Sequence, residues 1–318
     1  MKAIVTGASG FIGSQLVAEL IKEGFQVAAI GRRKLNDLPN IRSQLLAGST
    51  YLALDLDSPD QIVTELRGLG FYGSGLRFFF HLAWGGKSRL SDLDVHGQNK
   101  NITRTIETYE IAENLEADRY IFCGSMEESF AEAYTTLDYK NDSKYNRHVV
   151  YALAKISARN ALKLRYKKRG PEVLFGTNSH VMGPGDDKDS FLQVALGKIL
   201  RKEDIAMSSG DQIFDVINVK DCAKAYVAIA KKGTLGASYL IGSGNPRKLK
   251  QYVEEMNELF PSVTIQYGSM PFNDVLLDKK VFSIDRLIAD TDFSPSLSFS
   301  SSVVELANYL RSIDAVNS

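Results

Sequence analysis

Residues 2–13 read KAIVTGASGFIG, and this stretch decides the fold. The short apolar run Lys2–Thr6 has strand character and is followed by three glycines, Gly7, Gly10 and Gly13. Glycines in such a loop allow a tight turn, the close approach of a pyrophosphate, and close packing of a helix on the strand. Unpaired N–H groups at the start of the next helix favour phosphate oxygens. The stretch therefore predicts a dinucleotide-binding β–α unit, although three glycines alone also fit an ordinary strand-to-helix turn.

Outward from this unit, short apolar strands alternate with helices. Residues 11–22 show helical spacing, with Ile12, Leu16 and Leu20 on one face. Further strands are expected over residues 26–30, 51–54, 77–82, 120–123 and 172–175, and further helices over residues 99–114 and 150–168. This alternation predicts an α/β protein with a Rossmann-type, doubly wound parallel sheet that helices cover on both faces.

The end of the second expected strand carries two guanidinium groups, Arg32 and Arg33. An acidic residue at this position would accept hydrogen bonds from a ribose 2′-hydroxyl and favour NAD. This chain has no such acid, and two arginines suit a 2′-phosphate. The pair therefore favours NADP, with NAD still possible, and the alternative is a solvated basic turn.

After residue 176 the alternation weakens. The turn sequence GPGD at 183–186 and the four glycines of residues 233–244, which surround a short strand (SYLIG), break the chain into shorter pieces. We expect an NADP-binding Rossmann domain over residues 1–175 and a smaller C-terminal substrate-binding lobe over residues 176–318. Residues 213–230 still have the pattern of a strand and a helix, so residues 215–232 are expected to return to the main sheet.

Composition excludes several classes of protein. The chain has 318 residues and 38 basic against 38 acidic residues, and a net charge of zero argues against general nucleic-acid binding. Two cysteines cannot build a disulfide framework, and the four His and two Cys show no metal-ligand spacing. The N-terminus lacks a signal-peptide pattern, and no apolar stretch reaches about 18 residues. We therefore expect a soluble, cytoplasmic protein that binds neither nucleic acid, membrane nor metal.

A phenol and an ammonium lie one helical turn apart in the segment Tyr151-Ala-Leu-Ala-Lys155. The ammonium favours the phenolate, so the Tyr can protonate a carbonyl oxygen as hydride arrives, or take a proton in reverse. This spacing is common by chance, and its value comes from its position after the apolar strand that ends at Ser125. Ligands gather at strand carboxyl ends in open α/β sheets, so the Ser125 hydroxyl can meet the same oxygen. Ser125, Tyr151 and Lys155 are the candidate catalytic residues.

Several motifs, taken in order along the chain, point to one family. They are TGASGFIG at 6–13, Asp55-Leu56, His81-Leu82-Ala83, Asn99, Ser125 and the Tyr151/Lys155 pair. Together they resemble the extended short-chain dehydrogenase/reductases and, more narrowly, the NAD(P)-dependent epimerase/dehydratase family that acts on nucleotide sugars. Looser matches follow at 182–186 (MGPGD) and 214–219 (FDVINV), so that the resemblance extends to about residue 300.

The resemblance implies a role for each matched residue. The cofactor would be held by Gly7, Ser9, Gly10, Phe11, Ile12, Gly13, Arg32, Arg33, Asp55, Leu56, Leu82, Ala83, Trp84, Asn99 and Lys155. The substrate would meet Trp84, Met126, Glu127 and His180, although core packing is an equal interpretation for Trp84. Three residues depart from the family pattern: Phe214 replaces an Arg for the substrate's diphosphate, Met182 an aromatic residue and His180 an Asn.

The residues after Ser125 distinguish the reactions of the family. Its dehydratases carry an acid and then a base there, whereas this chain has Met126, which cannot protonate a leaving hydroxyl, and Glu127. Glu127 and Glu128 fit solvated loop carboxylates, with a base still possible. The absence of an acid at position 126, the Arg32/Arg33 pair and the stretch GSMEE at 124–128 together favour an NADPH-dependent reductase of a 4-keto-6-deoxy sugar nucleotide. The alternatives are an epimerase or 4,6-dehydratase of the same family, and a non-catalytic NADP-binding relative.

The resemblance also implies a homodimer. The helices over residues 99–114 and 150–168 would pair with their symmetry mates in a four-helix bundle. Ile102, Ile106, Ile111 and Leu162 would supply the apolar surface. The alternative is that these side chains face the sheet of their own subunit.

Overall fold

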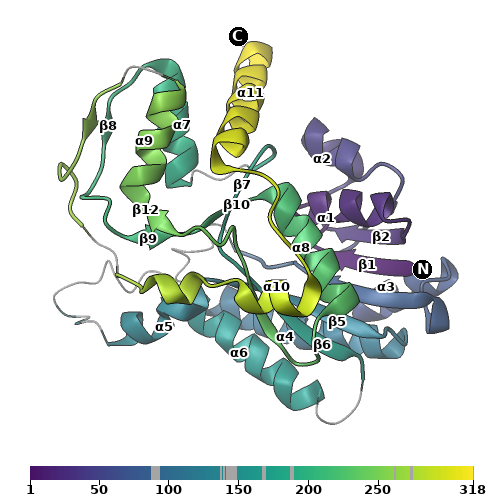
Figure 1. Cartoon of the computed structure of the whole chain (residues 1–318). Helices are drawn as coiled ribbons and strands as arrows, with labels where there is room; N and C mark the ends of the chain where they lie inside the picture. Colours follow the sequence, from purple (N-terminus) through teal and green to yellow (C-terminus); the bar gives the residue numbers. More distant parts are fainter. Residues whose placement is uncertain are drawn as a thin grey trace.

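The computed structural model describes residues 1–86, 94–136, 138, 140, 149–166, 170–186, 190–260, 263–272 and 275–317. Its centre is a sheet of seven strands in the order β11-β6-β5-β4-β1-β2-β3, all parallel (Figure 1). The strands are β1 (Lys2–Thr6), β2 (Gln26–Gly31), β3 (Thr50–Ala53), β4 (Leu76–His81), β5 (Arg119–Ser125), β6 (Glu172–Asn178) and β11 (Ser238–Ile241). The strand order reverses between β1 and β4, where open α/β sheets bind ligands. The expected Rossmann-type sheet is confirmed.

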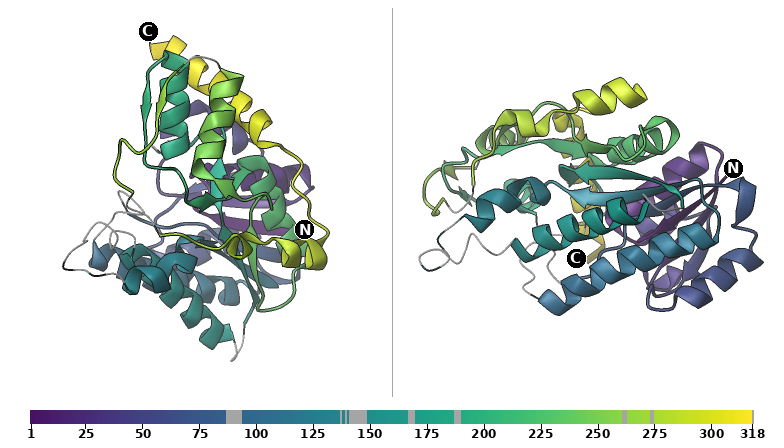
Figure 2. Two further views of the ribbon diagram at one scale, coloured as in Figure 1. Left: turned by 60° about the vertical axis from the view of Figure 1, so that its left-hand side comes forward. Right: turned by 90° about the horizontal axis from the view of Figure 1, so that it is seen from below.

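Helices cover both faces of the sheet, and a separate apolar core lies on each face. One face carries α1 (Phe11–Lys22), α2 (Asn40–Leu45), α8 (Val219–Lys232) and α10 (Asp285–Thr291). The other carries α3 (Pro59–Gly68), α4 (Val95–Asn114) and α6 (Val149–Tyr166). The long helices α4 and α6 run side by side, as seen from below in Figure 2. Because both faces are covered, a central strand such as β5 is apolar along most of its length.

A smaller lobe begins where β6 ends. Its helices α7 (Phe191–Arg201), α9 (Leu249–Leu259) and α11 (Phe299–Asn317) share a third apolar core (Figure 1). Three short strand pairs support them: β7 (His180–Met182) with β10 (Val216–Asn218), β8 (Ile205–Ala206) with β13 (Ile265–Gln266), and β9 (Ile213–Phe214) with β12 (Arg247–Lys248). This lobe therefore stands at the carboxyl end of the main sheet, where the site residues are expected.

Two segments differ from the sequence expectation. The strand expected near residue 215, β10, pairs with β7 in the smaller lobe, and only α8, directly after it, returns to the main sheet. Residues 127–135 form a helix, α5 (Glu127–Thr135), where loop carboxylates were expected. Within the described residues, 3-10 turns lie at η1 (Leu35–Asp37), η2 (Gly73–Gly75) and η4 (Lys279–Phe282).

The helices expected to form a dimer bundle show which apolar residues their own subunit uses. Ile111 and Leu162 are buried in the second core, so for these two side chains the alternative interpretation is correct. Ile102 and Ile106 pack against the same core and are partly buried. The α4 and α6 surface that remains exposed includes Leu153 and Leu164 instead.

Candidate active site

The loop between β1 and α1 depends on missing Cβ atoms. Gly7 has a φ of 72°, and a Cβ there would lie 2.6 Å from Ala83 N. A Cβ on Gly13 would lie 2.1 Å from Gly7 O. Gly10 precedes α1 and offers no side chain to cap it, while Phe11 is buried and anchors the first turn. The N–H groups and positive dipole end of α1 therefore suit the pyrophosphate of a dinucleotide.

A buried arginine of α2 donates a hydrogen bond to the main chain of the same loop. Arg42 donates from Nη1 to Ser9 O at 3.3 Å, and from Nε and Nη2 to Gly185 O at 3.2 and 2.7 Å. Gly185 belongs to the GPGD turn after β7, so one guanidinium connects the glycine loop with the smaller lobe. Sequence reasoning missed Arg42, because no spacing relates position 42 to positions 9 and 185.

The two arginines at the end of β2 are exposed. Tyr51, on β3, donates its hydroxyl to Arg33 O at 2.6 Å and so fixes the turn that carries Arg32 and Arg33. Burial raises the pKa of Tyr51, so that its hydroxyl remains a donor. On the next strand end, Asp55 accepts from Arg104 Nη2 at 3.0 Å, while Leu56 is buried in the second core.

A buried histidine lies between the glycine loop and the end of β5. His81 ends β4, and its Nδ1 lies 2.8 Å from Thr6 Oγ1 while its Nε2 lies 3.3 Å from Thr105 Oγ1. Burial, together with the positive charge of Lys155, lowers the pKa of His81 to about 3. The neutral ring is flanked by the Tyr120 ring and the Phe122 ring, so it serves as a rigid support between β1 and α4.

The loop after β4 places Trp84 beside Tyr151 and Lys155, while Leu82 packs against the first core and Ala83 against the second. The Trp84 indole donates from Nε1 to Gln98 Oε1 at 2.9 Å. Asn101 accepts from Gly85 N at 2.8 Å and donates to Gly85 O at 2.9 Å, which fixes the next peptide. Both amide side chains come from the buried side of α4.

The expectation for Asn99 is corrected. Asn99 is exposed, whereas Asn101 is 3% exposed and contacts the loop beside the site. Because a helix turns about 100° per residue, two residues move a side chain to nearly the opposite face. The signal that reveals the right residue is a polar stripe at spacings of three and four along α4: Gln98, Asn101, Thr105 and Thr108.

Tyr151 and Lys155 lie on the buried side of α6 and meet both neighbouring elements. Lys155 Nζ donates to Cys123 O on β5 at 2.8 Å and lies 3.8 Å from the centre of the Trp84 ring. The Tyr151 ring meets the Trp84 ring edge to face, with centroids 6.1 Å apart. An aromatic face stabilises an ammonium by a cation–π interaction. The end of β5, α6 and the loop after β4 therefore converge on this phenol–ammonium pair.

Ser125 ends β5 and forms hydrogen bonds with two residues at the start of α5. Its N–H donates to Glu128 Oε1 at 2.9 Å, and its Oγ accepts from Glu127 N at 3.3 Å. Glu128 is paired with Arg159 of α6, with 2.7 Å between Arg159 Nε and Glu128 Oε2, and Glu127 is 9% exposed. The expectation of two solvated carboxylates is therefore wrong, because α6 supplies a cation that sequence spacing does not reveal.

Among the residues expected at the substrate, Met126 lies in an apolar wall, Trp84 packs against the second core, and Glu127 and His180 are polar. Met126 is buried and clusters with Phe130 and Phe282, and Val149 and Phe214 pack against them. His180 opens β7, donates its backbone N–H to Asp215 O at 3.0 Å, and has a buried Nε2 without a hydrogen-bond partner. Burial lowers the pKa of His180 to about 4, so the ring is neutral near pH 7. Met182 is buried in the third core and does not join this wall.

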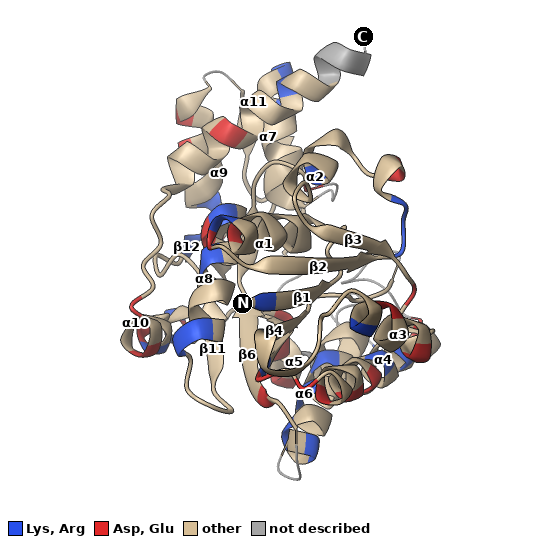
Figure 3. Cartoon of the chain, turned by 90° about the vertical axis from the view of Figure 1, so that its right-hand side faces the viewer, with Lys and Arg blue, Asp and Glu red and all other residues tan. Residues whose placement is uncertain are grey.

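Both basic and acidic residues lie on the side of the molecule shown in Figure 3. No helix within the described ranges is long and apolar enough to cross a membrane. The same part of the chain holds no cluster of three His, Cys, Asp or Glu residues that could bind a metal ion.

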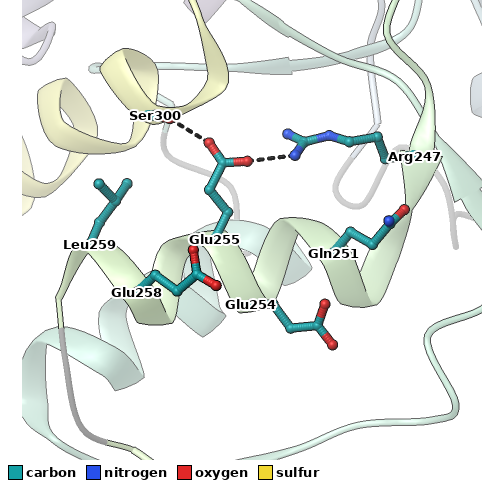
Figure 4. Close-up of a pocket in the computed structure, with 7 residues that line it drawn as sticks. All are labelled: Arg247, Gln251, Glu254, Glu255, Glu258, Leu259 and Ser300. Carbon is teal, nitrogen blue, oxygen red and sulfur yellow. Dashed lines mark hydrogen bonds and ion pairs between the residues drawn. The ribbon is translucent and has the colours of Figure 1, made fainter.

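The pocket in Figure 4 lies away from the candidate catalytic residues. It is lined by α9 and by Arg247, which forms an ion pair with Glu255 at 2.5 Å, and by Ser300 of α11. A second pocket shares Arg247 and Glu255 and reaches residues 295–299. Both pockets belong to the smaller lobe and contain none of the residues predicted for cofactor or catalysis.

Comparison with known proteins shows the family of the chain. The model of the NAD dependent epimerase/dehydratase family matches residues 3–242. CDP-abequose synthase of Salmonella typhimurium (strain LT2) is 25% identical, over 96% of this chain and 97% of that protein. dTDP-glucose 4,6-dehydratase of Escherichia coli is 26% identical, over 78% of this chain and 73% of that protein.

The fold is shared with solved structures as well. The UDP-glucuronic acid 4-epimerase of Bacillus cereus, in complex with UDP-glucuronic acid and NAD, superposes with a TM-score of 0.76 at 18% identity, over 98% of this chain and 100% of that chain. At this identity the likeness concerns the fold alone. With the glycine loop, the phenol–ammonium pair and the family match in place, the chain belongs to the NAD-dependent epimerase/dehydratase family and is an enzyme of the oxidoreductase type.

Proposed function

We propose that this enzyme is an NADPH-dependent reductase of a 4-keto-6-deoxy sugar nucleotide. The observation that carries the proposal is the convergence of Tyr151, Lys155 and the end of β5 beside Trp84. A relative that aligns along nearly the whole chain is named for the synthesis of a CDP-linked sugar, which supports a sugar nucleotide as substrate.

In this mechanism the protein handles the proton. A nicotinamide dinucleotide, when bound by the glycine loop, would supply the hydride. Tyr151 gives its phenolic proton to the carbonyl oxygen, because that oxygen gains negative charge during reduction. Lys155 favours the phenolate that remains, and the Ser125 hydroxyl donates a hydrogen bond to the same oxygen.

The cofactor would be held by main chain at one end and by charge at the other. Residues 7–13 and the start of α1 would bind the pyrophosphate. The exposed Arg32 and Arg33 would bind a 2′-phosphate and so favour NADPH over NADH. Lys155 would also hold the nicotinamide ribose.

The wall around Met126 supports reduction over dehydration. Met126 cannot protonate a leaving hydroxyl, and its apolar cluster with Phe130 and Phe282 suits the methyl group of a 6-deoxy sugar. His180 would offer its buried Nε2 to a substrate hydroxyl, because a buried ring nitrogen without a partner is unfavourable until a ligand reaches it. Epimerisation is the second candidate, and it would require that the cofactor stays bound through the catalytic cycle.

The test measures NADPH oxidation with a panel of CDP-, dTDP- and UDP-linked 4-keto-6-deoxy sugars. Tyr151→Phe keeps the packing against Trp84 and removes the proton, so turnover should fall about 10²–10⁴-fold with nearly unchanged cofactor affinity. Lys155→Ala should lower both turnover and cofactor affinity. Wild-type turnover in Tyr151→Phe together with a large loss in Glu127→Gln would overturn the assignment. No oxidation of NADPH with any of these sugars, but interconversion of epimers, would favour the epimerase.

We also propose a homodimer formed through α4 and α6. Leu153 and Leu164 are exposed on α6, and a two-fold pairing of these helices would cover them. The mass in solution at micromolar concentration tests this, and a strictly monomeric mass would contradict it.

A further inference from the structure

A buried ion pair connects the catalytic serine with the catalytic helix. Arg159 lies one helical turn after Lys155 on α6, and its Nε and Nη2 donate to Glu128 Oε2 and Oε1 at 2.7 and 3.1 Å. The same Oε1 accepts the N–H of Ser125 at 2.9 Å. The side chains of Arg159 and Glu128 are only 11% and 9% exposed. The peptide of Ser125 is therefore held by a carboxylate that α6 itself orients.

Further contacts fix the guanidinium. Arg159 donates from Nη1 to Ser238 Oγ on β11 at 2.7 Å and from Nη2 to Thr177 Oγ1 on β6 at 2.8 Å. Its guanidinium also lies 5.0 Å from the centre of the Phe175 ring. Arg159 thus binds three neighbouring elements in addition to the helix that carries it, and its side chain has little freedom to move.

The residue before the serine leaves room for this pair. A Cβ on Gly124 would lie 2.6 Å from Arg159 Nη2 and 2.6 Å from Glu128 Oε1. Both atoms end side chains, which yield before backbone does, so an added methyl group would displace the ion pair. Gly176 O on β6, at 3.2 Å from the same Cβ, would have to give by only a few tenths of an ångström. Gly124, Glu128 and Arg159 therefore act together as one arrangement.

We infer that Glu128 and Arg159 are positioning residues, which set the Ser125 hydroxyl relative to Tyr151. Tyr151, Lys155 and Arg159 follow one another at intervals of four residues, so they lie on one side of α6. A shift of Ser125 against that helix would remove its hydrogen bond to the reacting oxygen. The inference rests on the proposed function in one respect, that Ser125 contributes to turnover.

The first experiment is a double-mutant cycle with Ser125→Ala. Glu128→Gln keeps the shape of the side chain and weakens the hydrogen bond to Ser125 N, and we expect kcat to fall about tenfold with cofactor Kd unchanged. In the Ser125→Ala background the same change should have no further effect on kcat. An equal loss in both backgrounds, or no loss in the first, would overturn the inference.

The second variant keeps both charges. Gly124→Ala displaces the pair without leaving a buried ion uncompensated, as a single substitution in the pair does. It should lower kcat about as much as Glu128→Gln and again leave cofactor Kd unchanged. Arg77→Gln is the matched control, because Arg77 pairs with Asp118 at the opposite end of β5, where both side chains are about half exposed. Its kcat should equal that of the wild type.

A measurement without substrate separates this inference from the proposed function. Amide hydrogen exchange at Ser125 should be faster in Glu128→Gln and in Gly124→Ala than in wild type, and unchanged in Arg77→Gln. Unchanged exchange in both test variants would overturn the inference even in an active enzyme. If the wild type reduces none of the keto sugar nucleotides, the proposed reaction fails, and the exchange result still decides whether the ion pair holds the serine.

Discussion

The glycine loop after β1 and the end of β5 are separated only by β4 in the same sheet, yet they are built differently. The loop is made of main chain, and its shape depends on Cβ atoms that are absent at Gly7 and Gly13. The end of β5 is held by charged side chains, Glu128, Arg159 and Lys155, that come from two helices. A main-chain site depends on backbone shape and on the N–H groups that this shape directs, whereas a side-chain site depends on the charge of residues far along the chain.

The largest expected effect tests whether side chains add selectivity to the main-chain loop. Replacing both Arg32 and Arg33 by Ala should lower NADPH affinity about 100-fold, because two charge-assisted contacts to a 2′-phosphate are lost. NADH affinity should stay nearly unchanged, since the glycine loop binds the part common to both cofactors. Titration of each cofactor measures this, with Lys34→Ala as the neighbouring basic control. Equal affinities in the unchanged enzyme would contradict the prediction.

A methyl group added at Gly13 should distort the glycine loop directly. In Gly13→Ala the Cβ would meet Gly7 O at 2.1 Å, and a backbone atom cannot move aside as a side chain can. The free energy of unfolding should fall by about 1–3 kcal/mol, and cofactor affinity should fall with it. Denaturant unfolding and cofactor titration measure the two effects. Gly68→Ala is the control, because nothing lies within 4 Å of a Cβ there; a loss as large in that variant would refute the steric explanation.

His81 lies between the two regions and should make stability depend on pH. Its folded pKa of about 3 is below the ordinary 6.5, so the unfolded chain binds the proton more readily and stability is lost as pH falls below about 6.5. Between pH 7.5 and pH 5 this single group should remove about 2 kcal/mol from the free energy of unfolding. Unfolding of His81→Asn should show a flatter pH dependence. His96→Asn, at an exposed position, is the control. An identical pH dependence of stability in the wild type, His81→Asn and His96→Asn would exclude His81 as the source.

The smallest expected effect sharpens the comparison, because it concerns Arg42, a side chain that binds the main-chain loop. Arg42→Met removes the donor to Ser9 O and should weaken cofactor binding by about fivefold, the equivalent of one net hydrogen bond. Arg67→Met, which removes an exposed contact to Asn114, should leave cofactor affinity unchanged. A loss in Arg42→Met as large as that in Gly13→Ala would mean that the loop does not hold its shape by itself.

What the sequence predicts well is local. Residues 11–22 were expected as a helix and form one with the same bounds, because the apolar spacing and the glycine before it act within a few residues. The motif match selects Asn99, which is exposed, whereas the buried asparagine of α4 is Asn101, two positions later. A motif match does not take into account which face of the helix is buried. The sequence alone indicates a solvated Glu128. The ion pair that buries it cannot be read from local spacing, because its partner Arg159 comes from another helix. Strand pairing is non-local too, and β10 joined β7 because the chain turns away from the sheet at the end of β6.

The position of β11 has a consequence for synthesis of the chain. Residues 238–241 provide the last strand of the main sheet and pair with β6, which is made much earlier. Until they leave the ribosome, β6 has an open edge, and an open edge is a template for pairing with another chain. The first part of the protein to be translated therefore waits for the later part before β6 is paired on both sides. A fragment that stops at residue 175, where the alternating pattern weakens, would keep that edge permanently.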